Sequence, residues 1–251
     1  VASAAKQSLE DPKKATIAGI IAHGDLTHPE LDDIIDAHEQ AADGLLRGIR
    51  HSGAYDANPE ALTIPGRGAK GQYADPAFRG GVQRLGERGL TYDTWHYHHQ
   101  NADFRDLANA VPGTTLILDH FGTPLGVGEY ADKRDEIFTQ WKDDIAAIAD
   151  CPNVIAKLGG LAMPDNGFGW DKRDLPPTSD EFVTAQAPYY EHAIACFGAD
   201  RCMFESNFPV DRLSISYNVL WNGLKKIAAQ YSASEQAAMF SGTARRVYQL
   251  T

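Results

Sequence analysis

The chain has 251 residues, of which 43% are hydrophobic and 23% charged, as in an ordinary soluble domain with a sizeable core. Its formal net charge of −11 opposes binding to the phosphates of nucleic acid, so we expect a small-molecule substrate and no nucleic-acid partner. Three cysteines without a Cys-x-x-Cys pair favour a reducing cytoplasm, and the lack of a long apolar stretch predicts no membrane partner.

Short apolar runs and helical segments alternate along the chain. Six runs predict strands, because continuous apolar character is typical of parallel strands covered on both faces; they lie at 15–26, 45–52, 90–99, 114–122, 153–161 and 201–210. Segments with helical spacing lie between them, at 29–44, 76–89, 101–113, 134–152 and 187–200. This alternation favours an α/β architecture, either a closed barrel or an open doubly wound sheet. We expect a single domain over residues 1–251, since no repeat or linker interrupts the pattern.

Two long loops break the rhythm, at 58–76 and 163–181, and both follow predicted strands. In a barrel, loops after strands build the mouth of the active site, although an idle surface insertion is the alternative. The C-terminal stretch from 232 predicts a capped helix followed by a short helix, with Ser232 or Ser234 as the cap.

Polar side chains gather where the apolar runs stop. They are His23, Asp25, Arg50, His51, His96, His98, His99, Asp119, His120, Lys157, Glu205, Asn207 and Asp211. The carboxyl ends of barrel strands meet at one mouth, so these groups would converge there. The sequence therefore predicts a functional site at the strand ends.

Within this set, His120 is the first candidate for a ligand or an acid/base group, because it ends the run LILDH. Strand alternation turns Asp119 away from the barrel interior and His120 towards it, if Leu118 also points inwards. A buried, hydrogen-bonded histidine is the structural alternative for His120.

Arg50 offers a planar set of donors suited to a substrate carboxylate or ester oxygen, with an ion pair at the rim as the alternative. His51 and Lys157 are further candidates for binding substrate, although structural roles are open for both. In the run WHYHHQ, alternation separates His96 and His98 from the other aromatic residues, and we favour His98 as the pocket residue.

The motifs RGIRHS, LDHFGTPLG, VIAKLGGL, RCMFESNFPVD and SGTARRVYQL resemble, in this order, segments of amidohydrolase-2 proteins. The resemblance covers nearly the whole chain. It implies a distorted (β/α)₈ barrel of TIM-barrel type and hydrolysis of a small carboxylic ester, lactone or amide by activated water.

The resemblance also implies that the six runs are the last six of eight strands, with the first two missing. The first strand of the family normally carries a His-x-His pair that can bind a divalent ion, and no such pair precedes Ala15. The resemblance implies one divalent ion, zinc or manganese, in the full-length relative, with His120 as a ligand. The alternative is that this chain binds no metal. An incomplete barrel would expose two sheet edges, so we expect association, including a homo-oligomer.

Many relatives have an aspartate where this chain has Asn207, and an amide cannot accept a proton from water. Glu205, two residues earlier, and Asp211, after the turn at Pro209, are the two candidates for the group that accepts this proton. The resemblance thus predicts catalytic roles for His120, Glu205 or Asp211, and Asn207. A metal-dependent decarboxylase and a catalytically silent binding barrel, of the same fold, remain the alternatives.

Overall fold

The computed structural model describes residues 1–10, 13 and 15–250. Its centre is one parallel sheet in which the six described strands lie in chain order. The strands are β1 Ile20–His23, β2 Leu46–Arg50, β3 Thr91–Thr94, β4 Leu116–Asp119, β5 Val154–Leu158 and β6 Cys202–Phe204. Each lies within a run that the sequence predicts as a strand, and their parallel pairing in chain order is that of a TIM-barrel type of α/β fold rather than of a doubly wound sheet.

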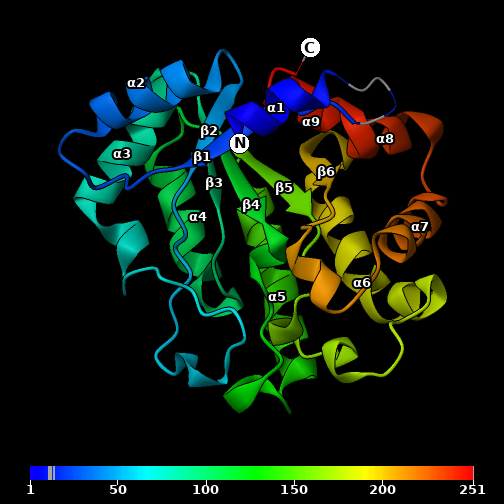
Figure 1. The fold of residues 1–251 in the computed structure, drawn as a ribbon. Helices are drawn as coiled ribbons and strands as arrows, with labels where there is room; N and C mark the ends of the chain where they lie inside the picture. The colour runs from blue at the N-terminus through cyan, green and yellow to red at the C-terminus, as the bar shows by residue number, and fades with distance from the viewer. Residues whose placement is uncertain (11–12, 14, 251) are drawn as a thin grey trace.

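Helices α2 to α6 follow the strands in turn and cover the outer face of the sheet (Figure 1). The α-helices are α1 Ala2–Ser8, α2 Leu31–Ala42, α3 Pro76–Glu87, α4 Asn101–Ala110, α5 Arg134–Ala149, α6 Ser179–Phe197, α7 Tyr217–Ala228, α8 Ala233–Ala237 and α9 Thr243–Val247. No helix in the described part of the chain has the length and apolar character needed to cross a membrane.

Two helices differ from the expectation. Helix α6 begins at Ser179 rather than near residue 187, because Thr178 and Glu181 form a capping box that starts it earlier. Helix α7 lies in a segment that we did not predict as helical, and Ser216 caps its first turn. At the C-terminus, Ser232 is the cap of α8, which confirms one of the two predicted caps.

The two faces of the sheet have different partners because side chains alternate along each strand. On the outer face, Ile49, Tyr92, Leu118 and Ala156 belong to the large core shared with the helices. On the inner face, a smaller cluster is formed by the side chains of Ile117, Ile155, Met203 and Tyr248, against which Ile21, Ala244, Val247 and Leu250 pack. The C-terminal segment therefore fills the inner side of the sheet near the start of the strands.

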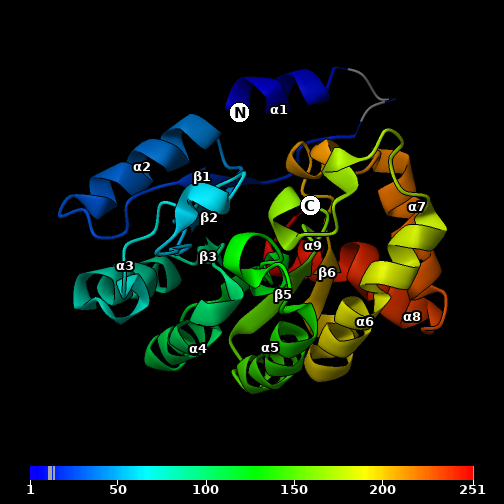
Figure 2. The same cartoon turned by 90° about the horizontal axis from the view of Figure 1, so that it is seen from below.

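In the described residues, β1 and β6 each pair with one neighbour, so the sheet is open between them. Figure 2 shows α1 on the side of the sheet opposite α4 and α5. The expectation that two further strands precede β1 stays a prediction.

Candidate active site

Four charged side chains form a layer on the inner face, one step nearer the strand ends than the apolar cluster, and three of them, Asp93, Asp119 and Lys157, are buried. Lys157 Nζ lies 2.6 Å from Asp93 Oδ2 and 3.1 Å from Asp119 Oδ1, and both carboxylates are fully buried. Asp119 also pairs with the guanidinium of Arg50, whose side chain is 38% exposed. Arg50 thus carries the layer from the interior to the mouth.

Electrostatics keep the two cations charged. The charge of Asp119 raises the pKa of Arg50 despite its burial. Burial lowers the pKa of Lys157, but Asp119 and Asp93 outweigh it and leave that pKa well above its usual value. The functional candidates Arg50 and Lys157 therefore lie together, as the sequence predicts, although each is bound to carboxylates of the protein.

The expected direction of Asp119 is wrong. Asp119 points to the inner face with Ile117, and Leu118 packs in the outer core. Our prediction assumed that the strand continues through His120, whereas β4 ends at Asp119 and His120 begins a tight turn with φ of 55°. Alternation stops at this turn, so both Asp119 and His120 reach the site.

The turn after β4 keeps a left-handed backbone at His120, Phe121 and Thr123. Non-glycine residues adopt this conformation rarely, and such strain persists where the surroundings hold it. The indole nitrogen of Trp141 donates to Phe121 O at 2.7 Å, and that of Trp95 donates to Thr123 Oγ1 at 2.9 Å. These bonds hold the turn that carries His120.

His120 pairs with Glu205, which follows β6. His120 Nδ1 lies 2.7 Å from Glu205 Oε1, and the two side chains are 6% and 18% exposed. Burial disfavours both charges, yet their mutual attraction raises the pKa of His120 and lowers that of Glu205. The contact between the two side chains therefore favours the protonated ring of His120 and the carboxylate form of Glu205.

Two glycines at the end of β5 make room for this pair. A Cβ atom on Gly159 would lie 2.4 Å from Glu205 Cγ, and one on Gly160 would lie 2.5 Å from His120 Nδ1. Gly160 also has φ of +85°, which side chains with a Cβ rarely adopt. The two glycines of the KLGG motif are therefore needed because any side chain there would clash with His120 or Glu205.

We expect Gly160→Ala to lose about 2 kcal/mol or more of unfolding free energy and most of any activity, since backbone strain and overpacking add. Gly89→Ala is the matched control, because Gly89 has φ of +70° and nothing within 4 Å of its added Cβ. Urea unfolding of both variants measures the difference. Equal losses would show that the contact with His120 has no effect.

Asp211 lies in the turn after β6, near enough to His120 and Glu205 for their charges to shift its pKa, and it is fully buried. Asn207 Nδ2 donates to Asp211 Oδ1 at 2.8 Å, while Asp211 Oδ2 has no hydrogen-bond partner among the described residues. Burial raises the pKa of Asp211 to about 7, although the bond from Asn207 and the charge of His120 oppose that shift. Asp211 can therefore exchange a proton near neutral pH.

The predicted histidines outside this group make other contacts. His51 Nδ1 accepts from Leu26 N at 3.0 Å, and burial lowers its pKa. His98 Nδ1 accepts from Leu125 N at 3.3 Å, in a 3₁₀ turn rather than a strand, because β3 ends at Thr94. The alternation assumed for residues 95–99 is therefore wrong, and the substrate-binding roles of His51 and His98 stay predictions.

Two further residues of this layer, Asp93 and Tyr248, were not predicted from the sequence. Asp93 lies in mid-strand, two residues after Thr91, and a charged residue inside a fully buried strand was the available signal. Tyr248 lies 155 residues from Asp93 along the chain, and its hydroxyl donates to Asp93 Oδ2 at 2.6 Å. Periodicity carries no signal for such a contact.

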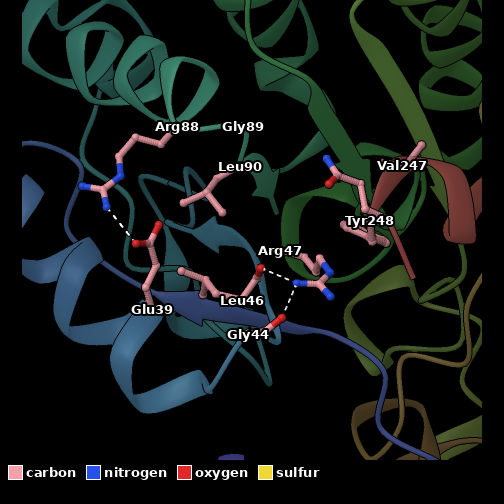
Figure 3. Close-up of a pocket in the computed structure, with 10 residues that line it drawn as sticks. Glu39, Gly44, Leu46, Arg47, Arg88, Gly89, Leu90, Val247 and Tyr248 are labelled. Atoms are coloured by element: carbon pink, nitrogen blue, oxygen red, sulfur yellow. Dashed lines mark hydrogen bonds and ion pairs between the residues drawn. The ribbon is translucent and has the colours of Figure 1, made fainter. Parts of the chain in front are cut away.

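A cavity of about 440 Å³ lies at the opposite end of the sheet, where the strands begin (Figure 3). Its arginines are already paired: Arg88 with Asp36 and Glu39, and Arg47 Nη1 with the carbonyl oxygens of Gly44 and Leu46. In TIM barrels this end serves stability, and the reacting groups lie at the other end. We therefore place the candidate site at the strand ends.

A catalytic zinc ion takes three protein ligands. His120 and Glu205 offer two donors, and no group of three or more His, Cys, Asp or Glu side chains able to hold a metal occurs within residues 1–10, 13 and 15–250. These donors do not make a complete zinc or manganese site. The assignment of His120 to a metal stays a prediction, and no chemical step below uses one.

Comparison with known proteins identifies the family of the chain. The uncharacterized protein y4mH of Sinorhizobium fredii is 34% identical over 238 residues, which cover 92% of this chain and 70% of that protein. The L-fucono-1,5-lactonase of Burkholderia multivorans is 28% identical over 238 residues, or 94% of this chain and 73% of that enzyme. A solved amidohydrolase from Burkholderia multivorans with bound zinc superposes with a TM-score of 0.79 at 24% identity, covering 100% of this chain and 78% of that one. A family model described as amidohydrolase matches residues 11–250, so the chain belongs to the amidohydrolase family.

Proposed function

We propose that this protein hydrolyses a small carboxylic ester, lactone or amide, with a lactone as the preferred substrate. The observation that carries the proposal is the charged His120–Glu205 pair beside Arg50 and Asp211 at the strand ends. Similarity to a lactonase supports the choice of substrate.

In the proposed reaction, His120 Nε2–H and Arg50 donate to the carbonyl oxygen of the substrate. Negative charge develops on this oxygen when water attacks, so donors fixed in a buried site lower the barrier. Glu205 keeps His120 protonated and fixes its ring through Nδ1. This division gives Glu205 a supporting role rather than that of the base.

Asp211 takes the proton of the attacking water, because its pKa of about 7 suits proton exchange at neutral pH. The Asn207 amide nitrogen is bound to Asp211, which leaves the amide oxygen to orient the water. Attack of the water forms the new C–O bond and places the carbonyl π electrons on the oxygen; when the C=O bond forms again, the bond to the leaving oxygen or nitrogen breaks and Asp211 gives its proton to that atom. The products of a lactone are one hydroxyl group and one carboxylic acid, which releases its proton to solvent and becomes a carboxylate.

The proposal is tested by assaying purified protein against a panel of lactones, esters and amides, with carbon dioxide release measured in parallel. We expect ring opening without carbon dioxide, and a loss of about 100-fold in kcat/KM for His120→Gln, as for the removal of one oxyanion donor. His192→Gln is the control, since His192 contacts Lys142 O on the outer helices.

Carbon dioxide release would favour the decarboxylase alternative. Ligand binding without turnover would favour a silent binding barrel. Equal rates for His120→Gln and the wild type would remove His120 from the mechanism.

A further inference from the structure

A chain of buried polar contacts runs from the C-terminal segment to Arg50. Tyr248, which follows α9, donates its hydroxyl to Asp93 Oδ2 at 2.6 Å. Lys157 Nζ lies 2.6 Å from the same oxygen and 3.1 Å from Asp119, and Asp119 holds Arg50. Four successive contacts thus connect Tyr248 to Arg50.

Tyr248 approaches this layer from the end of the sheet where the strands begin. Figure 3 shows it beside Arg47 at the wall of the cavity there, while its hydroxyl reaches Asp93 inside the sheet. The ring also faces Lys157, with Nζ 5.2 Å from the ring centroid. Tyr248 therefore contacts both the Asp93 carboxylate and the Lys157 ammonium group, at the end of the layer farthest from Arg50.

The ammonium group of Lys157 interacts with both Asp93 and Asp119. The strength of its interaction with Asp93 depends on the other hydrogen-bond donors to that carboxylate. Asp93 Oδ1 accepts from Thr91 Oγ1 at 2.7 Å, so the hydroxyl of Tyr248 and the ammonium of Lys157 share Oδ2. Without the tyrosine hydroxyl, a buried carboxylate loses one donor and attracts Lys157 more strongly. Asp119 would then have less of the lysine charge and would hold Arg50 more tightly.

We infer that Tyr248 is a positioning residue for Arg50, acting through Asp93, Lys157 and Asp119. It keeps Lys157 shared between the two carboxylates, so that the exposed part of the guanidinium stays available at the mouth. The inference rests on the proposed function, in which Arg50 donates to the substrate carbonyl. It assigns a part of the site to a segment at the far end of the chain.

The test combines Tyr248→Phe with Arg50→Gln. We expect Tyr248→Phe to lower kcat/KM about three- to tenfold at every pH, the effect of one hydrogen bond, with the pH at which activity rises unchanged. In the Arg50→Gln background, Tyr248→Phe should have no further effect on kcat/KM, because its action passes through Arg50. Tyr231→Phe, between α7 and α8, is the control and should match the wild type.

Additive losses in the double variant would overturn the inference. A second measurement does not need activity: urea unfolding of the same four proteins should give a non-additive free energy for the pair, although Tyr248 and Arg50 are linked only through other side chains. If no substrate is turned over, the proposed function fails, yet this cycle still decides the link. Additive unfolding free energies would then reject it.

Discussion

Replacing Lys157 by methionine should destabilise the protein by about 3–5 kcal/mol, the usual cost of removing one partner from a buried ion pair. Lys157 lies between two fully buried carboxylates and is itself 11% exposed. Methionine fills much of the same volume but leaves Asp93 charged without a cation and Asp119 with Arg50 alone. The expected loss is thus the desolvation of carboxylates that no longer have compensation.

Urea unfolding measures this loss, and Lys226→Met is the matched control. Lys226 Nζ also lies 2.6 Å from a carboxylate, that of Asp180, but the two side chains are 44% and 84% exposed. An exposed pair of this kind contributes about 0–1 kcal/mol. Adding Asp93→Asn to Lys157→Met should recover part of the stability. Equal losses for the two lysine variants would contradict a buried charged layer.

Asp211→Asn should reduce kcat/KM by about 10²- to 10⁴-fold, the contribution of a positioned general base. In the wild type, activity should rise with pH and level off above about 7, because Asp211 works only when deprotonated. Glu205→Gln should retain more activity, since Glu205 acts through His120. A larger loss for Glu205→Gln than for Asp211→Asn would make Glu205 the base instead.

The free energy of unfolding, measured against pH, shows whether Asp211→Asn loses activity because the protein unfolds or because the base is gone. The folded-state pKa of Asp211, about 7, exceeds the ordinary value of 3.8, so the folded protein binds this proton more tightly than the unfolded chain. The stabilisation is fully present below pH 3.8 and is lost as pH rises to about 7. Asp211→Asn removes the titration, so its unfolding free energy should fall less than that of the wild type across this range.

The positions of the strands could be predicted from sequence because burial on both faces leaves continuous apolar runs. All six described strands lie within those runs, and the placing of polar residues after them indicated one common mouth. The direction of a single side chain was less secure. Asp119 was assigned to the wrong face because the left-handed turn at His120 ends the alternation one residue early.

The pairing of charges followed from tertiary structure alone. From the sequence, Glu205 and Asp211 were both candidates for the base that activates water. In the structure, the charge of His120 lowers the pKa of Glu205 despite burial, whereas burial raises the pKa of Asp211. The same applies to Gly160, where a Cβ atom would clash with His120 in the turn after the adjacent strand β4.

The sequence by itself determined the parallel α/β architecture, the positions of the strands along the chain and the end of the sheet that holds the polar groups, since apolar runs and helical spacing encode which residues are buried. Only the tertiary structure decided that Tyr248 meets Asp93, that Lys157 lies between two carboxylates and that His120 pairs with Glu205. Those contacts join strands and helices far apart in the chain, and the free energy of a buried charge depends on the atoms around it rather than on its sequence neighbours.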